Sequence, residues 1–277
     1  MKKRLLILLG LFLTTVPAAF AQRDEFGAWL EVEGEKAVTK RLDLSVGIGL
    51  RANDNVREMS RWNISLGGSY EIFKWLKAGL TYQCISDLNR KEVKEDYKKS
   101  NGAFNGYNVD EKYRRDKHRV SFDLTGKTKI GRFTISLRER YQYTHSVATD
   151  VERERYRDEA PAGYENPDNP GHQFGGQTWL SYELANDRKH SKNNHLMRTR
   201  VEVEYDIPKC KFTPSVSYEL KNSLQDAFKT TETRLIAGVK WKVNKKNTLS
   251  LDYLFNDGHY SDEPNLHVVS VGYKFKF

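Results

Sequence analysis

Segments in which apolar and polar residues alternate make up most of the chain, and this period-two pattern constrains the fold more than any other feature. Between Arg41 and Arg51, every second residue from Leu42 to Leu50 is apolar, and the residues between them are polar or glycine. Successive side chains of a β-strand point to opposite sides, so such a segment predicts a strand with one apolar and one polar face. Eleven segments carry the pattern: 25–33, 41–51, 62–72, 76–82, 120–126, 133–137, 199–207, 212–220, 235–243, 249–255 and 269–277.

The connections between these segments alternate in length. Short connections such as 73–75 and 208–211 take turns with longer ones, of which 86–117 and 146–195 are by far the longest. Short turns at one rim and long loops at the other are typical of outer-membrane barrels. The sequence therefore predicts an all-β fold: an antiparallel up-and-down transmembrane β-barrel of about 10 to 12 strands over residues 22–277, with long extracellular loops at 86–117 and 146–195.

A soluble β-sandwich is the alternative fold, because a sheet with one face on a core alternates in the same way. Three features favour the barrel. Many residues of the polar phase are Gly or Ser, as barrel interiors often require. Aromatic residues gather near both ends of the predicted strands, where two membrane interfaces would lie. The third feature is the C-terminal alternation through Tyr273, Phe275 and Phe277. It resembles the signal by which the barrel-assembly machinery of Gram-negative bacteria recognises its clients, so that machinery is an expected partner.

The number of strands conflicts with the even number found in single-chain bacterial barrels. If Phe277 ends in the periplasm, counting back through eleven strands puts the start of segment 25–33 outside the cell. We therefore expect either that 25–33 is not a wall strand, or that a further strand is hidden, for example at 177–184.

The N-terminus has the three parts of a secretory signal peptide. Residues 2–4 are basic, an apolar stretch runs from Leu5 to Leu13, and Ala19 and Ala21 occupy positions −3 and −1 before Gln22. This pattern predicts that residues 1–21 are a cleaved signal peptide, with an uncleaved anchor as the alternative. Export and a barrel together predict the outer membrane, and its lipids and lipopolysaccharide are then the expected surroundings.

Composition excludes a protein built from membrane-spanning helices. The mean hydropathy of the 277 residues is −0.74, and no apolar run of 18 residues follows the signal peptide. Without residues 1–21, 43 Lys and Arg face 37 Asp and Glu, a net charge of +6. This excess is small and spread along the chain, so we expect no nucleic-acid binding. Cys84 and Cys210 fall near opposite rims, about 25 Å apart across a membrane, so no disulfide is expected.

The polar faces of several predicted strands carry long side chains of both charges. The residues expected to line the lumen are Arg119, Asp123, Arg138, Arg140, Arg198, Arg200, Glu202, Glu204, Glu219 and Arg234. They predict either a narrow anion path or polar ligand site, or an Arg and Glu network that only stabilises the wall. Glu139, in contrast, falls on the apolar phase, where a carboxylate is costly in lipid. A bulge or a position near the rim is therefore expected there.

The candidate catalytic residues lie in no recognisable catalytic motif. Nucleophilic catalysis needs a Ser within reach of a His base, and the candidate pairs are His145 with Ser146, His190 with Ser191, and His259 with Ser261 beside Asp262. Only the His259 and Ser261 pair has a spacing that puts both side chains on one side of a strand. The remaining histidines show no metal-ligand spacing, and no phosphate-binding Gly loop is present. We therefore expect no catalytic residues, no metal and no cofactor.

Several motifs resemble those of an uncharacterised outer-membrane family common in Bacteroidetes, which is catalogued as a domain of unknown function. The motifs are Phe26-Gly27-Ala28-Trp29, the strand from Leu42 to Arg51, Arg198 with Arg200, Phe212-Thr213-Pro214 followed by Tyr218-Glu219-Leu220, and Tyr273-Lys274-Phe275. The resemblance implies the fold and the location but no activity. The expected function is a non-enzymatic narrow channel with a charge-lined lumen. The alternatives are a protein that interacts through its surface loops and a lipid esterase at the rim that uses His259 and Ser261.

Overall fold

The computed structural model describes residues 24–158, 172–258 and 265–277, and within them the chain is built from β-strands. The predicted signal peptide lies outside the described residues. No helix in the part of the chain that is described has the length and hydrophobicity needed to cross a membrane.

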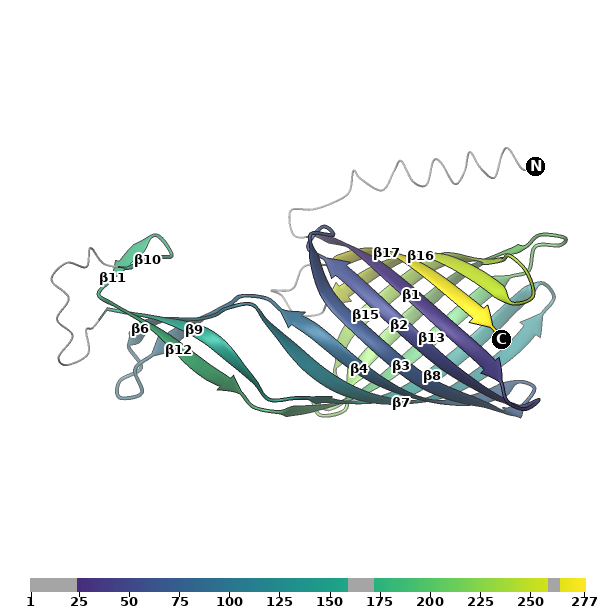
Figure 1. Cartoon of the computed structure of the whole chain (residues 1–277), viewed down its shortest axis with the longest axis horizontal. Coiled ribbons are helices and arrows are strands. Elements are labelled where there is room, and N and C mark those ends of the chain that lie inside the picture. The colour runs from purple at the N-terminus through teal and green to yellow at the C-terminus, as the bar shows by residue number, and fades with distance from the viewer. Residues whose placement is uncertain (1–23, 159–171, 259–264) are drawn as a thin grey trace.

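Eleven of the described strands close into one barrel in the order β1-β17-β16-β15-β14-β13-β8-β7-β4-β3-β2 (Figure 1). The barrel strands are β1 Glu25–Ala37, β2 Leu42–Asn53, β3 Glu58–Phe73, β4 Leu76–Asn89, β7 Tyr113–Ile130, β8 Phe133–Ser146, β13 Lys192–Tyr205, β14 Phe212–Ser223, β15 Thr230–Lys242, β16 Asn247–Gly258 and β17 Leu266–Lys276. All neighbouring strands of the wall except β1 and β17 are antiparallel, as expected for an up-and-down barrel. The predicted fold class, a β-barrel of about 10 to 12 strands, is confirmed.

The barrel closes through one parallel pair. β1 runs beside β17 in the same direction, from Glu25 opposite Leu266 to Glu35 opposite Lys276. The expectation of an even strand number is therefore wrong: residues 25–33 belong to the wall, and segment 177–184 does not. An odd number of strands is possible because a parallel ladder forms hydrogen bonds as an antiparallel one does. The start of β1 and the end of β17 therefore lie at opposite ends of the barrel.

The two ends of the barrel differ. The short-turn end carries the connections 38–41, 74–75, 131–132, 206–211 and 243–246, and the long-loop end carries the others. At the short-turn end, Gly131 has a φ of 61°, which suits the first position of a tight hairpin turn. Cys210 lies in one of these turns, whereas Cys84 lies near the other end of β4, and both thiols are free, as predicted.

The two longest insertions form a second sheet beyond the barrel, which we call the extension. Its strands are β5 Glu92–Tyr97, β6 Phe104–Asp110, β9 Thr149–Arg157 and β12 Ser181–Lys189, and the small hairpin of β10 His172–Phe174 and β11 Gln177–Trp179 lies near its far end. β6 of the first insertion pairs with β9 of the second. Figure 1 shows this sheet projecting from the long-loop end. Segments expected to be loops are thus largely strands.

The extension has its own small core. Val109, Tyr156 and Trp179 are buried there, and Tyr107, Phe174 and Tyr182 pack against them. The Trp179 indole Nε1 donates to the carbonyl of Phe174 at 3.0 Å, which satisfies its buried polar group. A side chain at position 106 would collide with the chain, because a Cβ on Gly106 would lie 1.9 Å from the carbonyl oxygen of Tyr156. Glycine at position 106 therefore allows the backbones of the two insertions to approach closely where β6 pairs with β9.

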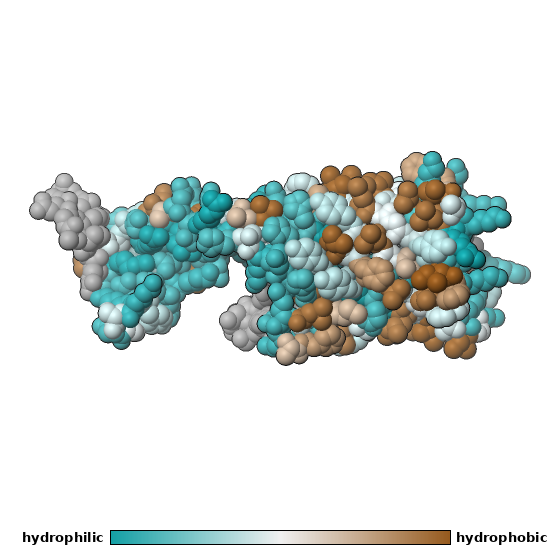
Figure 2. Space-filling view, turned by 90° about the horizontal axis from the view of Figure 1, so that it is seen from below, coloured by the Kyte–Doolittle hydropathy of each residue, from teal (hydrophilic) through white to brown (hydrophobic). Residues whose placement is uncertain are grey.

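The outer face of the barrel is apolar over most of its height. Leu66, Leu80, Ile48 and Val216 all expose more than half of their surface there. In Figure 2 hydrophobic residues gather over the barrel, whereas the extension is mainly hydrophilic. Glu139 interrupts this face near the middle of β8, where it accepts a hydrogen bond of 2.8 Å from Thr199 Oγ1. The ladders on both sides of Glu139 run without a bulge, so the expectation of a bulge or a rim position is wrong.

Candidate functional site

Charged side chains from neighbouring strands meet in register on the inner wall of the barrel. Alternation places every second residue inside, and in a sheet the residues at one level form a row across the strands. One row consists of Arg138, Arg200, Glu219 and Arg234, from β8, β13, β14 and β15. The next row consists of Asp123, Arg140, Arg198, Lys221 and Glu232. These rows bring together seven of the ten residues predicted to line the lumen.

Glu219 is the centre of the first row. Its carboxylate accepts hydrogen bonds from Arg138 Nη2 and Arg200 Nε, both at 2.9 Å, and another from Arg198. The Arg234 guanidinium lies 3.8 Å away. Only 2% of the Glu219 side chain is exposed, so this one buried carboxylate compensates several cations at once.

The other acidic residues of this region each have partners of their own. Asp123 forms a two-point contact with Arg140, and Glu232 binds Lys221 at 2.8 Å and Arg234 at 2.6 Å. Lys240 joins Glu202 at 2.7 Å to Glu204 at 2.6 Å nearer the short-turn end. Much of the predicted Arg and Glu network therefore exists as ion pairs.

Arg119 is the exception among the predicted lumen residues. Its Nε donates to Thr144 Oγ1 at 3.1 Å, and within the described part of the chain no carboxylate lies within 4.0 Å of its guanidinium. Arg51 is similar, because its nearest carboxylate oxygen, Oε1 of Glu31, is 3.7 Å away. Among the described residues, Arg119 therefore has no carboxylate within ion-pair distance, and Arg51 has only this long contact with Glu31.

Sequence reasoning missed Arg51 and Arg61, although the signal was present. Both residues occupy the polar phase of their strands, and Arg51 follows directly from the alternation of residues 41–51. They are direct register partners on β2 and β3. Arg61 contacts Asp87 through two hydrogen bonds, and Lys117 Nζ lies 2.7 Å from the same carboxylate.

These charged residues surround a cavity of about 740 Å³ inside the barrel. Its lining reaches from Asn89 and Leu266 near the long-loop end to Glu33 and Ser215 deeper in the lumen, and includes eleven Lys or Arg but only six Asp or Glu. Toward the short-turn end, Lys274 and Lys276 hold Glu35 in ion pairs, and these three side chains do not line the cavity. The lumen therefore holds a cavity with mainly basic lining residues, and further ion pairs lie outside that cavity toward the short-turn end.

Small residues on the inner wall leave room for these side chains. Gly49 on β2 is the clearest example, because a Cβ there would lie 2.6 Å from the Asn63 amide oxygen. A closed barrel of this size has little interior space to spare, so the glycines of the polar phase help to keep the cavity open.

The described residues show no hydrogen bond between the predicted partners His145 and Ser146. His145 Nδ1 lies 2.7 Å from Asn193 Oδ1 on the outer side of the wall, and Ser146 follows it on the opposite phase. His259, Ser261 and Asp262 lie outside the described residues. Within the described ranges, no group of three or more His, Cys, Asp or Glu is arranged to hold a metal ion.

The C-terminal aromatic residues lie at the end of the parallel seam. The Tyr273 hydroxyl donates to Asn247 Oδ1 at 2.5 Å, and the rings of Phe275 and Phe277 pack edge to face with centroids 4.8 Å apart. The Phe277 backbone N–H donates to the Glu35 carbonyl at 2.9 Å, and 70% of the residue is exposed.

Comparison with known proteins finds a family and several solved structures that the chain resembles. No curated protein matches the chain. The β-domain of the Bordetella autotransporter BrkA is similar over 86% of this chain and 82% of its own, with 8% sequence identity and a TM-score of 0.46. A porin is similar over 83% of this chain and 56% of its own, with 10% identity and a TM-score of 0.30. One family model, described as "Protein of unknown function (DUF2490)", matches residues 26–266.

Proposed function

Since the chain belongs to the DUF2490 family of proteins of unknown function, we propose a role for it from its own geometry: an outer-membrane β-barrel that acts as a narrow, non-enzymatic channel with a preference for small anions. The single observation that carries the channel is the cavity of about 740 Å³ with its excess of basic lining residues.

The proposed location follows from the outer face of the barrel. A water-soluble monomer rarely exposes a contiguous apolar surface of this extent. Leu66 and Leu80 expose 58% and 57% of their surface in the middle of that face, where lipid would cover them. Outer-membrane lipid and lipopolysaccharide are then the surroundings of the wall. Tyr273, Phe275 and Phe277 are proposed as the signal that the barrel-assembly machinery recognises.

The anion preference follows from the charges that remain after ion pairs are counted. Clefts lined by one sign of charge with walls of low dielectric raise the local concentration of the opposite ion. The paired side chains near the short-turn end, such as Lys240 with Glu202, would keep the path narrow. A channel of this kind passes small charged solutes and holds back larger ones.

The experiment is planar-bilayer recording on the refolded barrel under a salt gradient. The expected result is a small conductance with a reversal potential on the anion-selective side. Replacing Arg198 and Arg200 together by Ala should shift that potential toward zero. The matched control, Arg155→Ala with Arg188→Ala, removes two charges from the extension and should leave it unchanged.

A folded barrel without conductance would overturn the channel proposal. The extension would then be the remaining candidate surface, which corresponds to the alternative of a surface-interaction protein. If the variant without Arg198 and Arg200 keeps the same anion selectivity, these two residues do not cause the preference.

A further inference from the structure

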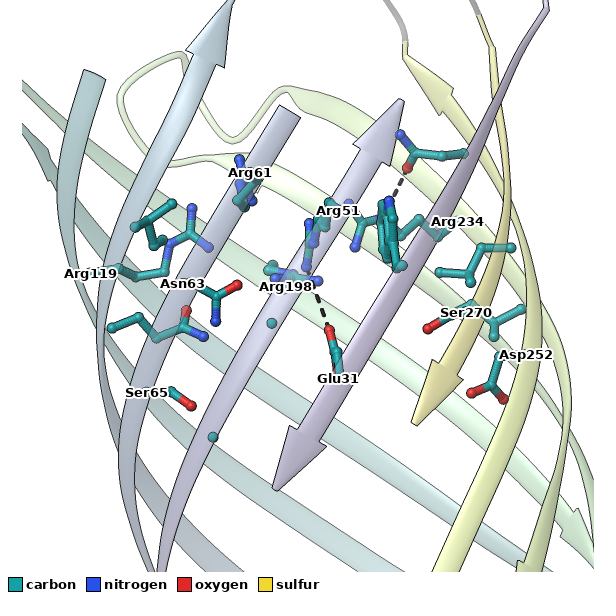
Figure 3. Close-up of a pocket in the computed structure, with 18 of the residues that line it drawn as sticks. Glu31, Arg51, Arg61, Asn63, Ser65, Arg119, Arg198, Arg234, Asp252 and Ser270 are labelled. Atoms are coloured by element: carbon teal, nitrogen blue, oxygen red, sulfur yellow. Dashed lines mark hydrogen bonds and ion pairs between the residues drawn. The ribbon is translucent and has the colours of Figure 1, made fainter. Parts of the chain in front are cut away.

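One part of the lumen gathers five guanidinium groups from five strands. Figure 3 shows Arg51, Arg61, Arg119, Arg198 and Arg234 extending toward the same region of the cavity. Besides burial and Glu31, the groups with the largest electrostatic effect on Arg51 are the guanidiniums of Arg61, Arg119 and Arg234. Like charges directly opposite in a sheet are unfavourable, and Arg51 and Arg61 are such a pair.

Three of the five arginines have close carboxylate partners, and two do not. Arg61, Arg198 and Arg234 bind Asp87, Glu219 and Glu232 respectively. Arg51 has only its contact of 3.7 Å with Glu31, and no carboxylate of the described residues lies within 4.0 Å of the Arg119 guanidinium. The Arg51 Nε is also buried without a hydrogen-bond partner, and a buried donor of this kind costs free energy until an acceptor reaches it.

Trp29 holds Arg51 in a defined orientation. The two are register partners on β1 and β2, and the Arg51 guanidinium carbon lies 3.9 Å from the centroid of the Trp29 ring. Stacking uses the flat face of the guanidinium and leaves its N–H edge available for an acceptor in the same plane. This arrangement is suited to a planar or tetrahedral oxyanion, which accepts two parallel hydrogen bonds from such an edge.

We propose that the cavity contains a specific site for a small oxyanion, a carboxylate or phosphate group, bound between Arg51 and Arg119. Arg61 contributes further positive charge, and Asn63 and Gln83, which line the same cavity, offer neutral hydrogen-bond donors. The proposal rests on the proposed channel function, because it names the class of solute that the lumen would select. A general excess of positive charge would only attract anions, whereas this site would bind one of them.

Trp29 also provides a signal for the experiment. An anion that moves the Arg51 guanidinium relative to the Trp29 ring should change the fluorescence of Trp29. The barrel in detergent is titrated with sodium phosphate and, in a second arm, with sodium acetate, each against sodium chloride at equal ionic strength. We expect saturable changes with one or both oxyanions and none with chloride. The signal should disappear in Trp29→Phe, which identifies it among the five tryptophans of the chain.

Variants then test the two arginines. Arg51→Gln and Arg119→Gln should each weaken oxyanion binding roughly tenfold or more, the usual effect of losing a charged hydrogen bond. Lys240→Gln is the matched control, because it removes the same charge from a part of the lumen where Glu202 and Glu204 already compensate it. Arg119→Lys, which keeps the charge without the two-pronged donor, serves if Arg119→Gln does not fold.

The outcomes separate this proposal from the channel. If the oxyanions behave like chloride, or if Arg51→Gln weakens binding no more than Lys240→Gln, the site is refuted even when the barrel conducts anions. If oxyanions bind but no conductance is found, the channel fails and the site remains.

Discussion

Arg200 of β13 and Glu219 of β14 are direct register partners whose side chains meet inside the barrel, with Nε and Oε2 2.9 Å apart. Two further arginines donate to the same carboxylate. Compensation of charge in this lumen is thus concentrated on a few buried acidic residues.

Replacing Glu219 by Gln should therefore destabilise the barrel strongly. Removing one partner of a buried ion pair typically costs about 3–5 kcal/mol, because the remaining charge stays buried without compensation. The measurement is the free energy of unfolding in denaturant for barrels reconstituted in lipid vesicles. Glu31→Gln is the control: the Glu31 side chain is 60% exposed with one contact at 3.7 Å, so a change of about 0–1 kcal/mol is expected. Equal effects of the two substitutions would contradict the central position of Glu219.

The parallel seam predicts a specific cross-link. Leu30 and Val271 are register partners on the outer phase of β1 and β17, and neighbouring strands lie about 4.8 Å apart, within reach of a disulfide. With Cys84 and Cys210 replaced by Ser, the variant Leu30→Cys with Val271→Cys should form an internal disulfide on oxidation, seen as a shift on non-reducing gels. Leu30→Cys with Leu251→Cys should not, because β17 separates β1 from β16. A cross-link in the second variant alone would show that β1 lies beside β16 and would contradict the parallel seam.

Acid should loosen the extension before it affects its aromatic core. The Asp110 carboxylate of β6 binds Arg153 of β9 at 2.6 Å and Lys189 of β12. Burial alone would raise the pKa of Asp110, but the hydrogen bonds from Arg153 and Lys189 outweigh it and hold this pKa below its usual value. A carboxyl whose pKa is lowered by folding stabilises the fold above its unfolded pKa, about 3.9, and this contribution is lost as the pH falls further.

We therefore expect hydrogen-exchange protection of β6, β9 and β12 to fall as the pH is lowered from 5 to below about 4. Asp110→Asn should lower that protection already at pH 5, by about 3 kcal/mol in opening free energy. It should also remove much of the acid dependence. If the protection of these strands in Asp110→Asn still falls with acid as in the unmodified protein, other carboxyl groups cause the effect.

Glu139 predicts a substitution that stabilises the barrel in lipid. Its carboxylate lies on the apolar outer face with Thr199 as hydrogen-bond donor. Acidic residues on the lipid side are less costly than basic ones, so Glu139→Leu should increase the free energy of unfolding in vesicles by about 1 kcal/mol. Thr199→Val should decrease it, because the carboxylate then loses its partner. A decrease in both variants would indicate that Glu139 contacts protein rather than lipid.

The alternation of residues was sufficient to predict the wall strands and the side of the wall on which each residue lies. Which face a side chain occupies is a local property of a strand, so Arg198, Arg200 and Glu219 could be placed inside from their neighbours alone. The same rule applied to Arg51 would have placed it there too. Glu139 shows the limit of the rule, because the alternation placed it outside but gave no indication of Thr199 as its partner.

Pairing between distant segments was decided only by the tertiary structure, because hydrogen-bonded ladders join residues far apart in the sequence. Such pairing forms the parallel seam between β1 and β17 and joins the two insertions through β6 and β9. It also decides that some arginines meet a close carboxylate, whereas Arg51 has only a long contact with Glu31 and Arg119 has none within 4.0 Å among the described residues. By itself, the sequence determined the alternation and therefore a charged interior and an apolar exterior. The closed register determined which of the interior charges meet, and so where an uncompensated site can exist.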